Sequence, residues 1–456
     1  MKKSTYYLLN CILLASTAAF AEPVTHTIDQ HSTASNTELE MEKTRITELK
    51  LQLEQTNAAV SELRELFKKL HTKSHPAVEW EGYGVINYSQ YDFFRNVQDT
   101  VPDRRSKVDL ERLILEPKFK LSETMMFEAE LEIEHGGTGS TVEYEAAEFG
   151  EYELELEKGG EVVVEKAQLE IHSSAAINWH IGHIVVPFGM INRYTKPTDY
   201  FTASRSLGEA ALIPNTWHET GVELYGKAAV FNYRALVVNG LDSSGFSSQN
   251  WVAGGYQTRM EFANADDLAI VAVLDYPLAN HGLIGAAMYA GNSASNRHQQ
   301  NLAVSANVNI WEIHARYQQG PWIVRSQVMA GTVENSDLIT DANKNLVNQG
   351  VRGISATPVG HAAEAAYIEA AYNLLHSGTV NGRLDLFIRY DEFDTMAAVE
   401  GTIQDNLRYQ RNSTTLGLNY KPLPNIVFKA ELAEHQHAGE IANQFDHFAL
   451  GLGVTF

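Results

Sequence analysis

The sequence predicts an all-β fold: a 16-stranded antiparallel transmembrane β-barrel preceded by a periplasmic α-helical coiled coil. After residue 77, apolar residues recur at every second position, which is the period of a strand with one apolar face. Short and long polar connections alternate between these segments, as turns and loops do in membrane barrels. Before residue 72, apolar residues instead recur every seven positions, which is typical of a coiled coil.

Residues 1–21 are predicted to be a cleaved secretory signal peptide. Lys2 and Lys3 precede an apolar run, and the small-residue pattern Ala19-Phe-Ala21 marks the cleavage site. The apolar run is short for a membrane span, and no later stretch has the roughly 20 apolar residues that a transmembrane helix needs. The single cysteine, Cys11, lies inside this segment, so the mature chain must be held by packing or backbone hydrogen bonds rather than by a disulfide.

The chain is strongly acidic. Its formal net charge of −22 becomes −24 when the two lysines of the signal peptide are removed. This charge disfavours sequence-independent binding to nucleic acid, so we expect no nucleic-acid partner. A hydrophobic content of 44% fits a secreted soluble β-protein as well as a barrel with half of each strand in water. The strand pattern therefore has to decide between these two classes.

A polar leader at residues 22–37 precedes the predicted coiled coil at residues 38–72. The heptad positions are filled by Leu39, Ile46, Leu53, Val60 and Phe67 in one series and by Leu49, Leu63 and Leu70 in the other, which Glu42 and Thr56 interrupt. Such a narrow apolar seam needs partner helices, which favours oligomerisation. The alternative is a single amphipathic helix that lies on the barrel or the membrane. Pro76 is expected to end the helical segment.

Alternation defines the barrel domain, residues 77–456. In Phe127-Glu-Ala-Glu-Leu-Glu-Ile-Glu134, a strand places all four glutamates on one face. The predicted strands are 80–92, 108–121, 125–134, 161–172, 177–186, 218–226, 230–239, 267–276, 282–290, 301–318, 321–333, 362–374, 382–393, 411–421, 425–436 and 445–456. The even count places both barrel ends in the periplasm. The alternating stretch 151–157 is expected within the second long loop, although it could raise the count to 18.

The second face of each strand supplies the predicted pore lining. In a membrane barrel the apolar face contacts lipid, so the alternate residues face water in the lumen. The predicted pore-lining residues are Arg112, Glu116, Lys118, Lys120, Glu128, Glu130, Glu132, Glu134, Arg383, Asp385 and Arg389, with Asp391 beside them. Mixed signs with an acidic excess predict weak cation preference or little selectivity. Alternatively, these charges pair with one another and merely solvate the barrel interior.

The connection 187–217 is predicted to form a constriction. Its candidate residues are Arg193, Lys196, Asp199, Arg205 and Glu209. Loop residues held by a rigid scaffold often carry function. Trp217, His218 and Glu219 stand where this loop returns to the wall, and Trp217 is expected to pack there or to belong to an aromatic girdle.

Reaction chemistry is not expected. No catalytic motif and no convincing nucleophile-and-base pair is present, so a barrel lipase or protease has no candidate cluster and no cofactor is implied. His435 and His437 near His447 could bind a metal at a surface loop, although water-facing histidines are commoner than ligands. The Asp/Asn-rich run 337–348 lacks the spaced carboxylates of a calcium site, and we expect no metal.

The stretch from about residue 166 to residue 242 resembles the phosphate-selective porin O/P family. The segments that carry the resemblance are Lys166-Ala-Gln-Leu-Glu-Ile171, Trp179-His-Ile-Gly-His183, Pro187-Phe-Gly-Met190, Arg205-Ser-Leu-Gly208, Ile213-Pro-Asn-Thr-Trp-His-Glu-Thr-Gly-Val-Glu-Leu224 and Val238-Asn-Gly-Leu-Asp242. The resemblance implies a homotrimeric 16-stranded porin of the bacterial outer membrane, whose third loop folds into the lumen. It does not imply phosphate as substrate, because the ladder of lumenal arginines and lysines of phosphate-selective members is not found here.

These observations predict passive diffusion of small hydrophilic solutes or ions across the outer membrane. Two other functions stay open. One is a phosphate- or anion-selective channel, for which the basic residues of the connection 187–217 are the remaining argument. The other is a structural or adhesive barrel, anchored in the membrane and linked by its coiled coil to a periplasmic partner.

Overall fold

The computed structural model describes residues 43–48, 50–58, 60–62, 78–95, 99–137, 160–257, 263–346, 356–378, 381–439 and 444–456. The chain divides into two units, Met1–His75 and Pro76–Phe456. All described residues of the first unit are helical. The predicted signal peptide, the polar leader and both ends of the predicted coiled coil lie outside the described residues. Across the described ranges, no helix is long and apolar enough to cross a bilayer.

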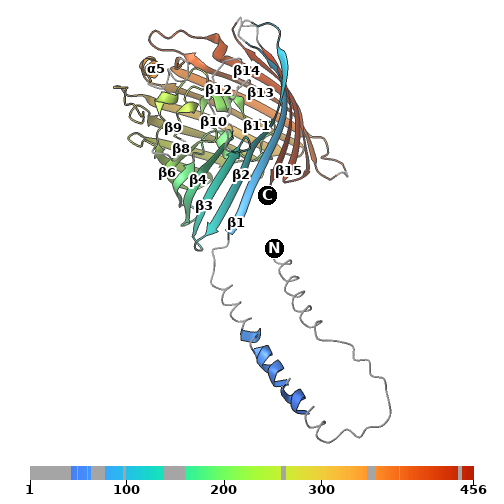
Figure 1. Ribbon diagram of the computed structural model, residues 1–456. Coiled ribbons are helices and arrows are strands. Elements are labelled where there is room, and N and C mark those ends of the chain that lie inside the picture. Colours follow the sequence, from blue (N-terminus) through green and yellow to red (C-terminus); the bar gives the residue numbers. More distant parts are fainter. Residues whose placement is uncertain are drawn as a thin grey trace. The chain divides into compact units, whose positions relative to one another are not determined.

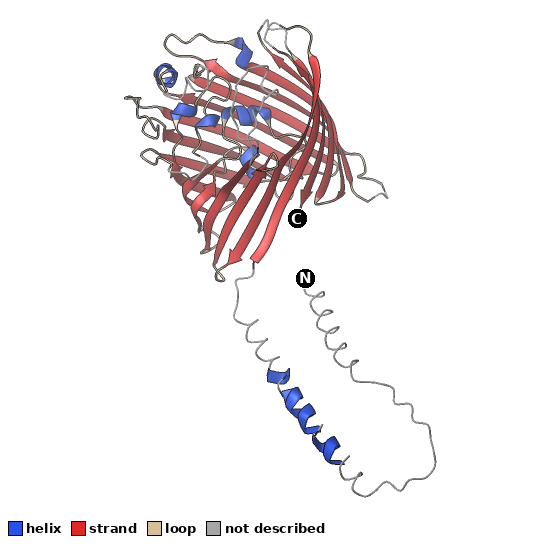
Figure 2. Cartoon of the chain, in the orientation of Figure 1, coloured by secondary structure: helices blue, strands red, loops and turns tan. Residues whose placement is uncertain are grey.

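The second unit is a closed barrel of 16 antiparallel strands, which β1 (Val78–Phe93) and β16 (Phe445–Thr455) close by pairing with each other (Figures 1 and 2). The strands between them are β2 (Asp103–Lys120), β3 (Met125–Glu134), β4 (Glu161–His172), β5 (Asn178–Val185), β6 (His218–Ala228), β7 (Phe231–Asn239), β8 (Leu268–Pro277), β9 (Gly282–Asn292), β10 (Asn307–Gln319), β11 (Trp322–Val333), β12 (Ala362–Asn373), β13 (Arg383–Ala398), β14 (Gln410–Leu423) and β15 (Ile426–His437). The predicted 16-stranded barrel is confirmed. Because β3 pairs directly with β4, no further wall strand lies between them, and the stretch 151–157 falls outside the described residues.

Most predicted strand boundaries agree with the structure to within a few residues, and three ends differ more. Strand β10 begins at Asn307 rather than at residue 301, because the segment before it belongs to a loop that Asn292 and Ser293 hold through hydrogen bonds to Ala306. Strand β2 begins five residues earlier than predicted, and β13 extends five residues further, to Ala398. Both extensions lie at the end of the barrel that carries the long loops.

The connections at one end of the barrel are mostly short turns, and the eight connections at the other end are mostly longer. The connections contain α3 (Met190–Arg193) and α4 (Leu207–Leu212), η1 (Ser243–Gly245) and η2 (Ala253–Gly255), α5 (Ser336–Lys344) and η3 (Leu407–Tyr409). Both ends of the barrel domain lie on the short-turn side, as the even strand count predicts.

The outer surface of the barrel is apolar, as the two-residue period predicts. On β13, Leu386 and Ile388 are 42% and 52% exposed, whereas Phe387 between them is buried. The exposed row continues around the wall in Trp311 and Leu416. Large apolar side chains that face outward all around a closed barrel match the surface that lipid requires.

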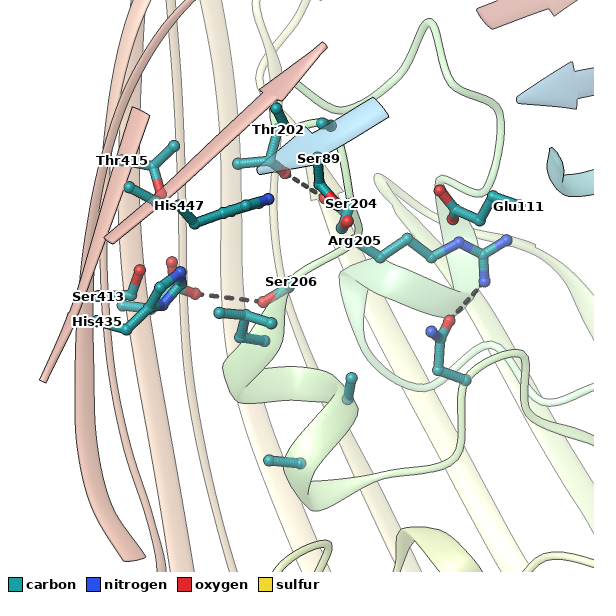
Figure 3. A pocket seen from close by; sticks show the side chains of 18 of the residues that line it. Ser89, Glu111, Thr202, Ser204, Arg205, Ser206, Ser413, Thr415, His435 and His447 are labelled. Carbon is teal, nitrogen blue, oxygen red and sulfur yellow. Dashed lines mark hydrogen bonds between the residues drawn. The ribbon is translucent and has the colours of Figure 1, made fainter. Parts of the chain in front are cut away.

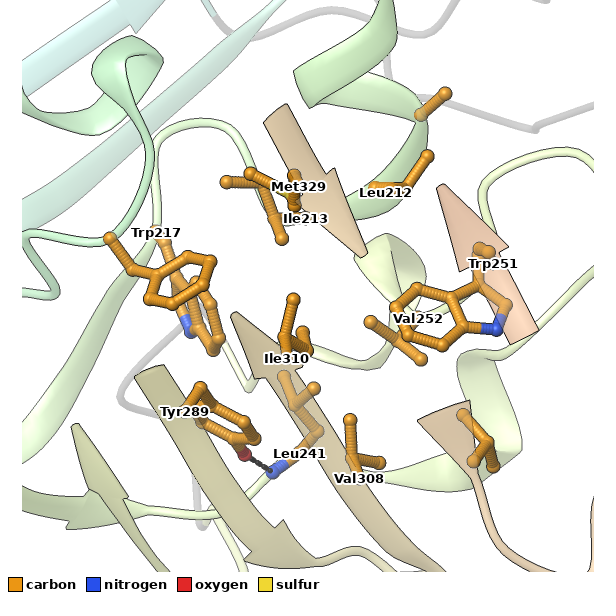
Figure 4. Packing of buried hydrophobic residues seen from close by; sticks show 14 of the residues in the cluster. Leu212, Ile213, Trp217, Leu241, Trp251, Val252, Tyr289, Val308, Ile310 and Met329 are labelled. Atoms are coloured by element: carbon orange, nitrogen blue, oxygen red, sulfur yellow. Dashed lines mark hydrogen bonds between the residues drawn. The ribbon is translucent and has the colours of Figure 1, made fainter. Parts of the chain in front are cut away.

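The inner surface differs between two sectors of the barrel, a difference that was not predicted from the two-residue period. On β7–β12 the inward side chains are mostly apolar, and with residues from the loops they form one buried cluster that includes Trp217, Tyr289, Ile310 and Met329 (Figure 4). The expectation that alternate residues face water throughout is therefore wrong for these strands. The physical reason is that two long connections fold inward and cover them, so their side chains are buried on the lumen side.

Candidate functional site

The connection 186–217 crosses the lumen and is held by side chains of the opposite wall. Lys429 Nζ of β15 donates hydrogen bonds to the carbonyl oxygens of Tyr200 (3.0 Å) and Thr202 (2.8 Å). The amide of Ala203 donates to Glu431 Oε2 at 2.7 Å, and Asn419 of β14 binds the Phe201 carbonyl at 2.8 Å. Because this loop starts at β5 and ends at β6, contacts with β14 and β15 place it inside the barrel, as the resemblance implied.

The first helix of this loop, α3, is anchored to β8 and β10. Arg193 forms a buried ion pair with Asp275 of β8, and its Nη1 lies 2.8 Å from His314 Nε2 on β10. The amide of Gly189 donates to Glu312 Oε1 at 3.1 Å. Together with the contacts to β14 and β15, these bonds fix both halves of the loop.

The second helix, α4, carries one of the predicted constriction residues, Glu209. Ser206 caps α4, since its side chain accepts a hydrogen bond from the Glu209 amide, and Arg389 Nη2 of β13 donates to the same hydroxyl at 2.6 Å. The Glu209 carboxyl accepts from the Ile191 amide at 3.1 Å. Burial, with a smaller contribution from repulsion by Glu312, raises the pKa of Glu209 to about 7.

Arg205 differs from the other charges of the loop. Its guanidinium donates to Thr216 Oγ1 at 2.9 Å and to Tyr83 OH at 3.3 Å, and it also bonds Asn215 (Figure 3). Among the described residues, no carboxylate forms an ion pair with it. Arg205 is therefore a buried cation that is held by neutral groups alone.

The other predicted loop residues occupy separate places. Lys196 lies 3.3 Å from Glu81 of β1, and the Asp199 side chain is half-buried. Trp217 is fully buried, with its ring centroid 4.9 Å from that of Tyr289. The packing role expected for Trp217 is thus confirmed.

The predicted pore-lining charges of β2 and β3 are largely paired with one another. Arg112 forms ion pairs of 3.0 Å with both Glu132 and Glu134. Lys118 lies 3.9 Å from Glu116 and 4.0 Å from Glu128, and Lys166 of β4 bridges Glu116, Glu128 and Glu130. Lys120 is at the short-turn end, where it pairs with Glu123 on the surface. Lys166 was not predicted to line the pore, although it lies on the polar face of a predicted strand.

The predicted charges of β13 are paired as well. Arg383 binds Asp385 at 2.7 Å, and Arg389 binds Asp391 at 2.6 Å and Glu369 at 3.2 Å. These contacts support the alternative in which many lumenal charges neutralise each other. As a result, few of the described lumenal charges remain without an ion-pair partner that would reduce their effect on a solute.

A polar cavity of about 960 Å³ lies between the loop 186–217 and the sector formed by β1, β2 and β13–β16 (Figure 3). Of the residues predicted to line the pore or the constriction, Arg205, Arg389 and Asp391 line this cavity. The other acidic and basic residues that line it are Lys107, Asp109, Glu111, Arg411 and Glu431. Its serine and threonine hydroxyl groups come from Ser89, Thr202, Ser204, Ser206, Ser413 and Thr415.

Most of this lining was not singled out from the sequence, although a signal was present. Arg411, Ser413 and Thr415 occupy alternate positions of a predicted strand, opposite its lipid face. His435 and His447 also line the cavity, and the His435 ring stacks on Phe445 at 4.3 Å. The two histidines therefore lie in the lumen and not on a surface loop.

Comparisons with known proteins agree with this architecture. No model of a known protein family matches the chain. An uncharacterised protein of Aquifex aeolicus (strain VF5) is 26% identical over 372 residues, which cover 81% of this chain and 79% of that protein. The outer membrane channel DcaP of Acinetobacter baumannii is similar with a TM-score of 0.51 at 12% identity, over 84% of this chain and 98% of that one. Salmonella typhi OmpF, in a complex with daunomycin, is similar with a TM-score of 0.50 at 10% identity, over the same shares of the two chains.

At these identities the solved structures bear on the fold alone. The resemblance to the phosphate-selective porin O/P family therefore stays a prediction. What the comparisons add to the geometry is that this chain has the barrel fold of outer-membrane channels.

Proposed function

We propose that the protein is a porin of the bacterial outer membrane, through which small hydrophilic solutes or ions diffuse passively. The observation that carries this proposal is the polar cavity of about 960 Å³ inside a closed barrel with an apolar outer surface. Water in such a cavity lets hydrated solutes cross the bilayer without contact with lipid. The loop 186–217 borders this cavity and sets the size of the solute that passes.

The charges around the cavity argue for little ion selectivity. Four basic residues (Lys107, Arg205, Arg389 and Arg411) and four acidic residues (Asp109, Glu111, Asp391 and Glu431) line it. Since rings of one sign are what produce strong ion preference, a balanced lining predicts weak preference. An excess of acid on β2 and β3 favours cations over anions, although most of those carboxylates are paired.

The purified protein in planar lipid bilayers tests this proposal. We expect stable open channels. In a tenfold salt gradient the reversal potential should be small, and its sign should indicate a preference for cations. A protein that inserts but gives no channels would favour the structural or adhesive alternative. A large reversal potential of the opposite sign would favour an anion-selective channel.

The anion-selective alternative rests on one specific observation, the Arg205 guanidinium. It lines the cavity and has only neutral partners among the described residues. If anions are selected, Arg205→Gln should abolish the preference while Lys120→Gln, at the short-turn surface, should preserve it. Equal effects of the two substitutions would exclude Arg205 as the selecting group.

We also propose that residues 38–72 associate as a periplasmic coiled coil in a homotrimer. Ile46, Leu53 and Val60 are spaced by seven residues in the helical segment, and all three are exposed within the described chain. A partner helix would bury this row. Deletion of residues 38–72 followed by sizing in detergent tests the proposal: a smaller assembly is expected, and an unchanged one would remove the coiled coil from oligomerisation.

A further inference from the structure

A second connection, residues 240–257, also crosses the lumen, and we call it the strap. It leaves β7, and its middle contacts elements on the far side of the barrel. The Ser248 amide donates to Thr357 Oγ1 at 3.0 Å, and the Ser248 hydroxyl donates to the Pro358 carbonyl at 2.6 Å. Arg411 of β14 donates to the Gln249 carbonyl at 2.9 Å. The middle of the strap is therefore fastened to β14 and to the segment that precedes β12.

The base of the strap is tied to two neighbouring connections. Ser243 Oγ donates to the Ser293 carbonyl at 2.9 Å, and Asn343 of α5 donates to the Ser243 carbonyl at 3.1 Å. Arg297 donates to Asn343 Oδ1 at 2.9 Å. These buried bonds make the strap part of one layer with the residues around 293–301 and with α5.

Trp251 fixes the middle of the strap in a notch of the barrel wall. Its Nε1 donates to the Gly360 carbonyl at 2.9 Å, and the side chain is fully buried. The notch exists because position 331 of β11 is glycine: a Cβ there would lie 2.5 Å from Trp251 Cη2 and 2.8 Å from the Asn309 carbonyl oxygen. The indole therefore rests on the backbone of β11, where no larger side chain fits.

The strap covers an apolar part of the lumen. Trp251 and Val252 belong to the apolar cluster that also holds Val308, Ile310 and Met329 from the wall (Figure 4). The polar cavity is on the other side, and Gln249 and Asn250 of the strap line it. One face of the strap thus closes the apolar sector while the other borders the solute path.

We propose that the strap is a second constriction element and that Trp251 sets the width of the channel by holding it in place. This inference rests on the proposed porin function and adds a specificity-determining residue to it. With the indole in its notch, apolar packing excludes water and ions from the sector beside β8–β12. Without it, the strap loses its central anchor and a cavity of indole size opens next to the path.

The test compares Trp251→Ala, Gly331→Ala, the double variant and Trp251→Phe with the wild-type protein. Trp311→Ala is the matched control, because Trp311 lies on the outer surface of β10 and is 48% exposed. Single-channel conductance is recorded in planar bilayers, and the size limit is measured by liposome swelling with sugars of increasing size. Correct assembly of each variant is verified by its resistance to unfolding in detergent.

We expect Trp251→Ala to raise conductance by roughly a factor of two and to admit larger sugars, because pore width governs both. Gly331→Ala should act in the same direction, since the added methyl group displaces the indole. The effect of the double variant should not exceed the larger of the two single effects, because both substitutions remove the same contact. Trp251→Phe should give a smaller increase, and Trp311→Ala none.

An assembled Trp251→Ala protein with wild-type conductance and size limit would overturn the inference, as would additive effects in the double variant. If Trp251→Ala does not assemble, Trp251→Phe takes its place in the test. An assembled Trp251→Phe protein with the conductance of the wild type would then overturn the inference. Wild-type protein without channels would contradict the porin function itself. Wild-type channels that the Trp251 variants do not alter would contradict the strap alone.

Discussion

The anchor of α3 offers a sharp test of how the loop 186–217 is held. Arg193 and Asp275 form an ion pair whose side chains are 11% and 7% exposed, and His314 Nε2 lies 2.9 Å from Asp275 Oδ1. Arg193→Ala leaves the Asp275 carboxylate buried with His314 as its remaining partner. The loss of one member of a buried pair costs 3–5 kcal/mol in general, and because His314 remains, we expect about 3 kcal/mol here.

The assay is denaturant unfolding of the barrel in lipid vesicles, followed by tryptophan fluorescence and combined with channel recording. The double variant Arg193→Met/Asp275→Asn removes both charges, so it should lose about 1 kcal/mol or less. Lys344→Ala is the control, because Lys344 and Asp341 form an exposed ion pair whose loss should not be measurable. Release of α3 from β8 and β10 should also make the open-channel current of Arg193→Ala noisier.

Two results would refute this reasoning. The first is an Arg193→Ala protein as stable as the wild type, which would mean that the pair does not hold the loop. The second is a double variant as unstable as Arg193→Ala, which would mean that the loss comes from packing of the arginine side chain and not from the unpaired carboxylate.

Three further predictions concern the loop and the wall. Glu209 has a folded-state pKa of about 7, above its unfolded value near 4.3. Its contribution to the free energy of unfolding is therefore complete below pH 4, and about 3 kcal/mol of it is lost as the pH rises to about 7. Glu209→Gln should remove this pH dependence, which unfolding measured from pH 4 to pH 8 checks. Gly453→Val should push the loop 186–217 away from β16, because a Cβ at this position would lie 2.4 Å from Pro197 Cβ. We expect the free energy of unfolding to fall by about 1–3 kcal/mol and the conductance to change. If both stay unchanged, this contact does not support the loop. Ile388→Arg places a charge on the exposed outer surface and should lower the free energy of unfolding in vesicles by about 2–4 kcal/mol. Ile388→Val should lower it little. Similar losses for the two variants would contradict lipid contact at this position.

The sequence alone determined the wall of the barrel. Every strand was predicted, and β3 and β4 have the predicted boundaries, because a strand with one face in lipid must alternate wherever its other face is polar. The position of the long connections followed from the same pattern. These are local properties, and each needs only about ten neighbouring residues.

The interior was less predictable, although part of its signal was present in the sequence. Residues 269–274 of β8 are apolar without alternation, and this indicates a strand that is buried on both faces. The pattern does not say what covers the inner face. The expectation of a polar lumen therefore failed on β7–β12, where the strap and the loop 186–217 lie.

Only the tertiary structure decided which residues border the path. The contact of Lys429 with Tyr200 joins positions 229 residues apart, and the notch at Gly331 has a meaning only once Trp251 occupies it. A two-residue period shows on which face of a strand a residue lies, but it does not show which distant loop contacts that face. The wall is therefore encoded locally, whereas the width and the charge of the channel depend on packing between segments that no local pattern connects.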